Sequence, residues 1–337
     1  MRKLKWGILS TALIGTEKVI PPMQKAELCD IVAIASRDEA RARKVAGELG
    51  IPTAHGSYEA LLADPEVEAI YNPLPNHLHV PWTVKAAEAG KHVLCEKPIA
   101  MSADEAMQLV EARDRHGVVI QEAFMVRTHP QWLKVRDLVR GGEIGELRAI
   151  QGFFSYYNVD PQNIRNMADI GGGGLYDIGC YPITTSRFVT GREPARLVGT
   201  LDVDPDMKID RLGSVILEFG GDAFPVQATF TFSTQLVSYQ RMHFFGTRGR
   251  IEVWIPFNAP PDRPSKIFVD DGSSLAGDGI RTIEVDTCDQ YGVAGDAFAR
   301  AVLDGTPPPV PLEDSVANMK VIDALFRSAR GNGWERP

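Results

Sequence analysis

The first 125 residues alternate strand-like and helix-like segments joined by short connections. The run Ile31 to Ala35 is entirely apolar, which is typical of a strand buried on both faces of a parallel sheet. The helix patterns have clear ends: residues 38–49 start at an aspartate and stop before Gly50, and residues 102–116 start with a Ser102–Glu105 capping box. Repeated βα units of this kind predict a doubly wound parallel sheet.

The pattern changes after residue 125. One more helix is expected over 129–139, and segments of alternating apolar and polar residues, typical of antiparallel strands, then follow. These expected strands cover 147–157, 196–203, 212–219, 225–233, 241–246 and 250–254, and two helices are expected over 294–303 and 315–330. Residues 258–280, rich in Pro, Asp, Gly and Ser, are interpreted as a surface excursion.

A chain of 337 residues predicts two domains. We expect an α/β protein with an N-terminal dinucleotide-binding Rossmann domain, residues 1–125. Residues 126–337 are expected to form a substrate-binding and oligomerisation domain of α+β type with a large, open, mainly antiparallel sheet.

Composition narrows the class of partner. The net charge is −8 and the chain has no long basic run, so no nucleic-acid partner is expected. No apolar stretch approaches the roughly 18 residues of a spanning helix, so no membrane partner is expected. Four cysteines without a C-x-x-C pair fit a reduced, cytoplasmic protein. His77 and His79 lack further ligands at metal-binding spacing, so no metal site is predicted.

A nucleotide loop is expected directly after the first strand, residues 4–9. Such a loop needs a tight turn, close backbone approach to the pyrophosphate and a helix start aimed at it. Small residues stand where the usual pattern has three glycines, and the loop hydroxyls can donate to phosphate. The residues assigned to this cofactor loop are Ser10, Thr11, Ala12, Leu13 and Ile14. Pro21 and Pro22 predict a break or kink in the helix that follows.

The end of the second strand distinguishes NAD from NADP. The strand ends in Ser36 and Arg37, and a hydroxyl with a guanidinium suits the 2′-phosphate of NADP, whereas a carboxylate would repel it. The neighbouring Asp38 is interpreted as the cap of the next helix. The sequence therefore predicts NADP as the cofactor, with NAD the less favoured alternative.

The motif Glu96-Lys97-Pro98 follows an apolar run at residues 92–95. A lysine at the carboxyl end of a parallel strand lies where open α/β sheets bind ligands, and it can relay a proton or polarise a carbonyl. The alternative is a surface lysine at a strand end. The Lys97–Pro98 peptide bond is also a candidate for the cis form.

A second motif begins with glycines 171–174 and continues into a helix-competent segment. The glycines are interpreted as a loop that lets backbone approach the substrate closely. Asp177 and Tyr181 are four residues apart, so a helix would place both on one face. A free phenol has a pKa of about 10. A nearby ammonium, such as that of Lys97, and the positive nicotinamide would favour the phenolate of Tyr181. The alternative is a packed helix tyrosine.

The segment from Ala86 to Pro98 resembles the signature of the Gfo/Idh/MocA oxidoreductases, and the resemblance runs over nearly the whole chain. The segment from Tyr176 to Pro182 resembles the branch that contains glucose–fructose oxidoreductase, dimeric dihydrodiol dehydrogenase and NADP-dependent xylose dehydrogenases. In that branch the matching tyrosine is the expected acid/base, and the resemblance implies a catalytic group of Lys97, Tyr181 and Asp177.

The resemblance also implies binding residues. The loop after the fourth expected strand would lie along the nicotinamide ribose, so the implied cofactor contacts are Pro73, Leu74, Asn76, His79, Glu96 and Lys97. Arg and Asn side chains supply the paired donors and acceptors that polyols need. The implied substrate contacts are Arg127, Asn163, Arg165, Asp177 and Tyr181.

These residues predict an NADP-dependent oxidoreductase that moves a hydride between the nicotinamide and a hydroxyl or carbonyl of a sugar or polyol. The simplest reaction is that of an aldose 1-dehydrogenase. A trans-dihydrodiol dehydrogenase remains an alternative, as does a cofactor-binding regulator without turnover. A sensor, however, needs no proton relay, and Lys97, Asp177 and Tyr181 are all present. Glycoside cleavage with bound NAD is the third alternative, and that branch departs from the E-K-P pattern.

Self-association is expected through the second domain. The helices after residue 140 are too few to cover both faces of a sheet of about six strands. The segments 226–232 and 241–245 carry aromatic and aliphatic residues, and an uncovered apolar face of this size usually meets a partner. We therefore expect a homodimer or a homotetramer.

Overall fold

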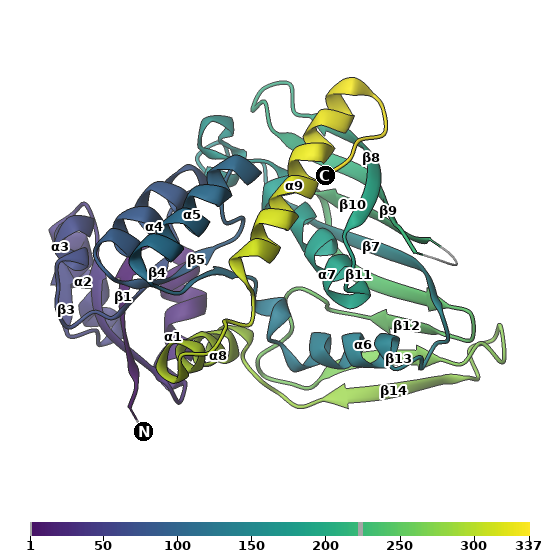
Figure 1. Cartoon of the computed structure of the whole chain (residues 1–337), viewed down its shortest axis with the longest axis horizontal. Coiled ribbons are helices and arrows are strands. Elements are labelled where there is room, and N and C mark those ends of the chain that lie inside the picture. Colours follow the sequence, from purple (N-terminus) through teal and green to yellow (C-terminus); the bar gives the residue numbers. More distant parts are fainter. Residues whose placement is uncertain (1, 222–224) are drawn as a thin grey trace. The chain divides into compact units, whose positions relative to one another are not determined.

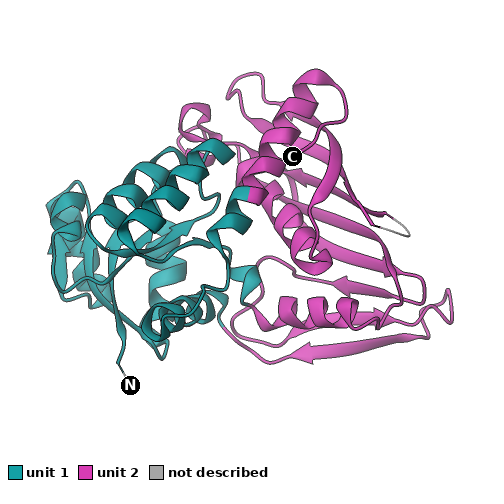
Figure 2. Cartoon of the chain, in the orientation of Figure 1, with its two compact units in different colours: residues 1–128, 289–316 teal, residues 129–288, 317–337 magenta. Residues whose placement is uncertain are grey.

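The computed structural model describes residues 2–221 and 225–337. The chain divides into two compact units (Figure 2). Unit 1 comprises residues 1–128 and 289–316, and unit 2 comprises residues 129–288 and 317–337. Residues 289–316 therefore lie with the N-terminal sheet, where Phe298 packs on Trp6 with ring centroids 5.2 Å apart. The functional division of the chain at residue 125 stays a prediction.

Unit 1 contains a six-stranded parallel sheet in the order β3-β2-β1-β4-β5-β6 (Figure 1). The strands are β1 (Leu4–Leu9), β2 (Cys29–Ala35), β3 (Thr53–His55), β4 (Ala69–Asn72), β5 (His92–Glu96) and β6 (Ile120–Ala123). The order reverses between β1 and β4, which is where folds of this type bind ligands. The doubly wound parallel sheet expected from the sequence is confirmed.

The helices of unit 1 surround this sheet. They are α1 (Ile20–Lys25), α2 (Glu39–Leu49), α3 (Tyr58–Leu62), α4 (His79–Glu88), α5 (Ala103–His116) and α8 (Gln290–Asp304), with the short helices η1 (Ile14–Val19), η2 (Asn76–Leu78) and η3 (Met125–Arg127). Ser102 caps α5 as expected, because its hydroxyl accepts the N–H of Glu105. Fully buried side chains such as Trp6, Ile8 and Tyr71 form the core.

The break expected at Pro21 and Pro22 takes the form of a change in helical geometry. The segment η1 is π-helical, and α1 begins directly after it with the prolines in its first turn. Proline lacks an N–H group, so it is tolerated at a helix start, and the wider π turn precedes the position where a normal bond would be lost.

Unit 2 contains an eight-stranded sheet in the order β14-β13-β12-β11-β7-β10-β9-β8. The strands are β7 (Leu147–Tyr157), β8 (Pro194–Val203), β9 (Asp210–Phe219), β10 (Val226–Ser233), β11 (Gln235–Gly246), β12 (Arg250–Val253), β13 (Ser265–Asp270) and β14 (Ile280–Val285). Strands β7 and β10 pair in parallel, and the other neighbours pair antiparallel. The large, mainly antiparallel sheet is confirmed.

The helices of unit 2 are α6 (Pro130–Arg140), α7 (Cys180–Thr190) and most of α9 (Leu312–Gly331), with the short helices η4 (Ile164–Asn166), η5 (Ala168–Ile170) and the π-helical η6 (Leu175–Gly179). In Figure 1 the three long helices lie on one face of the sheet. None of the helices in the described part of the chain is long and apolar enough to cross a membrane.

The interpretation of residues 258–280 as a surface excursion is wrong. Strand β13 lies there and pairs with β12 and β14, so the sheet has eight strands instead of about six. Ile267 and Val269 are buried, as alternation in a strand requires. The Pro, Asp, Gly and Ser residues on both sides of this short strand obscured its signal.

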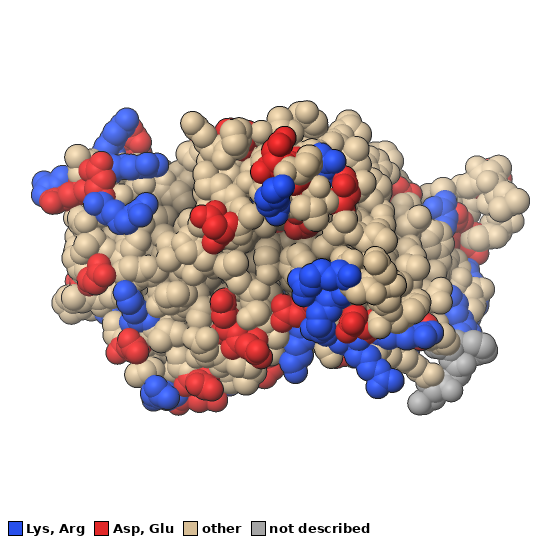
Figure 3. Space-filling view, turned by 90° about the horizontal axis from the view of Figure 1, so that it is seen from above, with Lys and Arg blue, Asp and Glu red and all other residues tan. Residues whose placement is uncertain are grey.

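The apolar residues of β10 do not lie on the uncovered face of the sheet, although this was expected for the segment 226–232. Val226, Phe230 and Phe232 are buried, and Phe232 lies against Gly174, which precedes η6, and Gly179, which ends it, so this face is the one that the helices cover. The opposite face carries a hollow of about 510 Å³ lined by uncharged polar and aromatic residues among others, including Gln151, Phe153, Thr229, Thr231 and Tyr239. Seen from above, at 90° to the view of Figure 1, the surface in Figure 3 carries basic and acidic side chains interspersed with one another.

Candidate active site

The loop after β1 makes a tight turn at the start of a helix. Ser10 has a φ of 81°, in the left-handed region that usually favours glycine. Its hydroxyl accepts the N–H of Ala12 at 3.3 Å, which stabilises the turn. Thr11 is buried, the side chain of Leu13 is 68% exposed, and Ile14 opens η1. The loop residues assigned from the sequence therefore form one turn at the start of a helix.

Two arginines, Arg37 and Arg41, lie near the end of β2. The carboxylate of Asp38 accepts the N–H of Arg41 and caps α2 as expected, while Ser36 accepts the N–H of Asp38. Arg41 also reaches back to the carbonyl of Thr11 in the nucleotide loop, at 3.5 Å. Burial raises the pKa of Tyr58, and Arg37 and Arg41 both act to lower it, which places both cations beside this phenol.

Arg41 was not expected at this site from the sequence. It is the basic residue one turn after the cap of α2, and such a side chain can face the loop below the helix start. Because Asp38 is engaged in capping, the groups at this strand end suit an anion better than a neutral ribose hydroxyl.

The loop after β4 is held by buried hydrogen bonds. The amide of Asn72 donates to the carbonyl of His79 and to the hydroxyl of Thr83, and its oxygen accepts the N–H of Leu74. Pro73 and Leu74 are buried, whereas Asn76, which opens η2, is half-buried. The loop therefore has a defined course, with Asn76 as its more accessible polar side chain.

His79, which was expected to contact the cofactor, is 1% exposed. Its two ring nitrogens lie 2.7 Å from the carbonyl oxygens of Leu74 and Pro98. Burial lowers its pKa to about 4. His79 therefore joins the loop after β4 to the E-K-P segment.

The E-K-P segment leaves β5 at the carboxyl edge of the sheet, as expected. Glu96 accepts the hydroxyl of the buried Tyr71 at 2.6 Å and the N–H of Lys97 at 3.3 Å. Burial and the charge of Glu96 both raise the pKa of Tyr71. Lys97 is half-buried, and the Lys97–Pro98 peptide bond is cis, which confirms that expectation.

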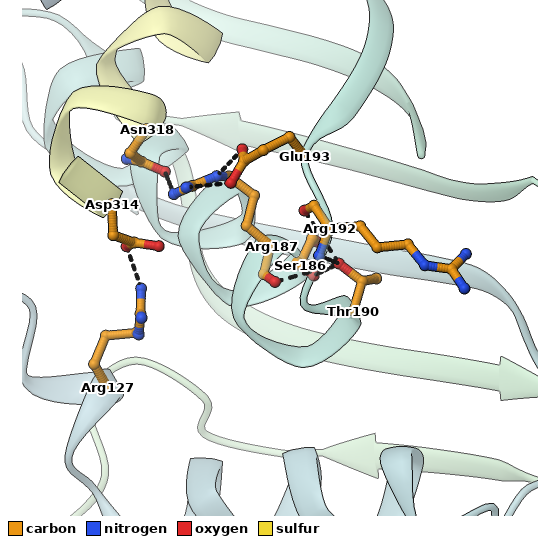
Figure 4. Close-up of polar contacts among 8 residues, drawn as sticks. All are labelled: Arg127, Ser186, Arg187, Thr190, Arg192, Glu193, Asp314 and Asn318. Atoms are coloured by element: carbon orange, nitrogen blue, oxygen red, sulfur yellow. Dashed lines mark hydrogen bonds and ion pairs between the residues drawn. The ribbon is translucent and has the colours of Figure 1, made fainter. Parts of the chain in front are cut away.

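Arg127, expected near the substrate, forms an ion pair with Asp314 of α9 (Figure 4). Its side chain is 8% exposed. Nearby, burial raises the pKa of Glu122 to about 7, while the charge of Arg127 lowers it. The observed role of Arg127 is thus a buried ion pair within unit 1.

The central polar cluster of unit 2 is built around Asp177. One carboxylate oxygen accepts the Arg165 Nε–H at 3.0 Å, and the other accepts the Tyr156 hydroxyl at 2.6 Å. The charge of Asp177 raises the pKa of Arg165, whereas burial and the same charge raise the pKa of Tyr156. Asn163 caps η4 by accepting the N–H of Arg165. Tyr156 had no chemical signal in the sequence beyond its place in a strand.

Tyr181 lies at the start of α7 and is 5% exposed. Its ring packs against Phe154 and Phe257, with centroid distances of 5.7 and 5.2 Å. Its phenol also interacts electrostatically with Arg165. Tyr181 is therefore a packed helix tyrosine, as the alternative interpretation expected, and its phenol also lies near the polar cluster around Asp177.

The glycine run serves the protein's own packing. A Cβ on Gly172 would lie 2.6 Å from the carbonyl oxygen of Met167, and a Cβ on Gly173 would lie 2.2 Å from a carboxylate oxygen of Asp210. We expected these glycines to let the backbone approach a substrate. In the structure they let it approach the backbone of Met167 and the carboxylate of Asp210.

The site residues divide between the units. Unit 1 holds the nucleotide loop, the end of β2 and the E-K-P segment, whereas unit 2 holds Asn163, Arg165, Asp177 and Tyr181. Among the residues that the structure describes, His, Cys, Asp and Glu form no group of three that could hold a metal ion.

The fold and these groups define a dinucleotide-binding oxidoreductase. Residues 4–124 match an oxidoreductase family with an NAD-binding Rossmann fold, and residues 132–252 match the Gfo/Idh/MocA C-terminal domain. The chain belongs to the Gfo/Idh/MocA oxidoreductase family, as its motifs indicated.

The similarity to known proteins extends over the whole chain. It is 50% identical to an oxidoreductase of Rhizobium meliloti over 335 residues, 99% of each chain. It is 41% identical to a D-xylose 1-dehydrogenase (NADP(+)) of Haloferax volcanii over 328 residues, 97% of each chain. A 3-ketoreductase of Actinomadura kijaniata, solved with NADP and TDP-benzene, matches with a TM-score of 0.89 and 30% identity, covering 97% of this chain and 98% of that one.

Proposed function

We propose that this protein is an NADP-dependent dehydrogenase of a sugar or polyol, most simply one that oxidises an aldose at C1 to a lactone. The observation that carries the proposal is the 41% identity, over 97% of both chains, to a D-xylose 1-dehydrogenase that uses NADP(+). The presence of Lys97, Asp177 and Tyr181 favours an enzyme over a cofactor-binding regulator.

The cofactor residues fit NADP. The turn at Ser10 is suited to the pyrophosphate, and Ser36, Arg37 and Arg41 suit the 2′-phosphate, because two guanidinium groups lie near Tyr58 while Asp38 caps α2. When bound, NADP supplies the hydride acceptor for alcohol oxidation.

Tyr181 is the proposed acid/base. Oxidation of an alcohol releases the hydroxyl proton, and a phenolate can accept it. The guanidinium of Arg165 favours the phenolate through its charge, and Asp177 holds Arg165 in place. Lys97 keeps the role that its motif predicts, as a group that relays a proton or polarises a carbonyl.

The test is a panel of aldoses and trans-diols with NADP and with NAD, followed at the NADPH absorbance band. We expect turnover of an aldose with NADP. Turnover of trans-diols alone would favour the dihydrodiol alternative. Tight binding of NADP without turnover of any substrate would contradict the proposal and favour a regulator.

A further inference from the structure

The function proposed above does not use Asp210, a buried carboxylate at the start of β9. Its side chain accepts the N–H of Leu175 at 2.5 Å, and Asp210 as a whole is 6% exposed. Leu175 is the first residue of η6, which continues directly into α7. Asp210 therefore binds the first turn of the helical segment that carries Asp177 and Tyr181.

The contact is built into the surrounding packing. The other carboxylate oxygen of Asp210 lies against Gly173, whose φ of 123° is open to glycine but strained for other residues. On a second side of the helix start, Phe232 of β10 packs so closely that a Cβ on Gly174 or Gly179 would lie 3.0 Å from its ring. The helix start thus has restricted freedom to shift.

A carboxylate in this position carries an energetic cost. Burial and the charge of Asp177 raise the pKa of Asp210 to about 7, although the N–H groups of Leu175 and Gly174 act in the opposite direction. An asparagine or serine could cap a helix without that cost. What the carboxylate adds is two strong acceptor oxygens for adjacent N–H groups.

We propose that Asp210 is a positioning residue that holds the start of the helical segment 175–190 and thereby places Asp177 and Tyr181 for proton transfer. The activity part of this proposal rests on the proposed function, whereas its structural part does not. Small displacements of reacting groups are costly to turnover, so the loss should appear in kcat.

The experiment compares Asp210→Ala and Asp210→Asn with wild type. Hydrogen exchange of the backbone amides in peptides covering residues 172–182 measures the helix start directly. Steady-state kinetics and an NADP titration measure its consequence. Asp204→Asn is the matched control, since Asp204 also accepts backbone N–H groups, from Asp206 and Met207, in a turn outside this helix.

For Asp210→Ala we expect faster exchange in these peptides and a kcat that falls by about tenfold to 10²-fold, with an NADP Kd close to that of wild type. Asp210→Asn keeps one acceptor oxygen, so both effects should be intermediate. Asp204→Asn should leave the exchange of these peptides and kcat unchanged.

Unchanged exchange in Asp210→Ala would overturn the proposal. Faster exchange with an unchanged kcat would overturn the positioning role while leaving the proposed function intact. If wild type turns over no substrate, the proposed function fails, and the exchange data still decide whether Asp210 holds the helix. If Asp210→Ala does not fold, wild-type exchange and kcat in Asp210→Asn would overturn the proposal.

Discussion

At the scale of single residues, the polar cluster of unit 2 separates two roles. Asp177 uses both carboxylate oxygens to accept from Arg165 and Tyr156, so its observed role is to orient these neighbours. Tyr181 is held by aromatic packing and lies within the electrostatic reach of Arg165. This division favours Tyr181 as the residue that carries the proton.

Replacing Tyr181 with phenylalanine should keep the ring packing and remove the proton-carrying hydroxyl. We expect kcat to fall by about 10²–10⁴-fold, as for the loss of a general acid/base, with NADP binding unchanged. Steady-state kinetics and a fluorescence titration of NADP measure the two effects. Tyr157→Phe, at a side chain 67% exposed, is the control. A Tyr181→Phe enzyme within a few-fold of wild type would remove Tyr181 from the mechanism.

Arg37 and Arg41 should determine the preference for NADP. Replacing either with alanine should weaken NADP binding by about 1–3 kcal/mol, the range for charge-assisted hydrogen bonds, and barely change NAD binding. Calorimetric titration with both cofactors measures this. Arg43→Ala, on the same helix but paired with Glu39, is the control. An equal loss for NAD and NADP would refute the assignment.

His79 should make the protein sensitive to acid. Its pKa is about 4 in the folded protein, against 6.5 for an unperturbed histidine. Between pH 4 and pH 6.5 the unfolded chain therefore binds more protons than the folded protein. Burial therefore makes the protein most stable above about pH 6.5 and less stable as the pH falls toward 4, although the two carbonyl contacts favour the protonated ring and reduce this loss. Urea unfolding of His79→Gln should show a smaller loss over this window. The exposed His116→Gln is the control, and parallel curves for wild type and His79→Gln would contradict this reasoning.

At the scale of elements, both loops that lead into the assigned sites are followed by π-helical turns. The segment η1 follows the nucleotide loop, and η6 follows the glycine run. Such turns are rare and are often found at functional sites. In η6 the start is held by Asp210 and Phe232, so the glycines before it are required by packing.

Two glycine substitutions should therefore have opposite effects on stability. Gly173→Ala places a methyl group against Asp210 at a positive φ and should destabilise the protein by about 1–3 kcal/mol. Gly47→Ala, inside α2 with open space around its Cβ, should stabilise it by about 0.5–1 kcal/mol. Thermal and urea unfolding measure both, and a neutral Gly173→Ala would contradict the packing argument.

At the scale of the whole molecule, the open face of the unit 2 sheet is uncharged only in its centre, because the ion pairs Arg196–Glu218, Arg241–Glu252 and Lys266–Glu284 lie on the strands around it. Its hollow is lined by Thr200, Ser214, Thr229 and Thr231, with Phe153 and Tyr239 in edge-to-face contact. Tyr239 and Trp254 are each almost half exposed and flank Arg241. An uncharged, partly aromatic centre bordered by ion pairs suits contact with a second copy of the chain.

We expect a homodimer or homotetramer that associates through this face. The double change Thr229→Glu and Thr231→Glu should shift the protein toward monomers, because a two-fold axis would bring like charges together on a desolvated surface. Light scattering coupled to gel filtration measures this. Gln108→Glu, exposed on α5, is the control. A monomeric wild type at micromolar concentration would disprove the expectation.

Local patterns in the sequence were sufficient to predict much of the fold of this protein and its family. Strand and helix periods, the Asp38 and Ser102 caps and the E-K-P motif identified the Rossmann sheet and the family, because each depends on neighbouring residues. Strand β13 was not predicted, because its six residues lie between clusters of Pro, Asp, Gly and Ser that indicate turns more strongly than the short strand indicates itself.

Only the tertiary structure decided which partners the charged side chains find. Arg127 pairs with Asp314, 187 residues away, and the Asp210 carboxylate accepts a hydrogen bond from Leu175, 35 residues away. It also decided that the apolar face of β10 lies under the helices and that His79 is enclosed by two carbonyl groups. The physical reason is that burial and ion pairing depend on distances in space, which the packing of strands and helices sets.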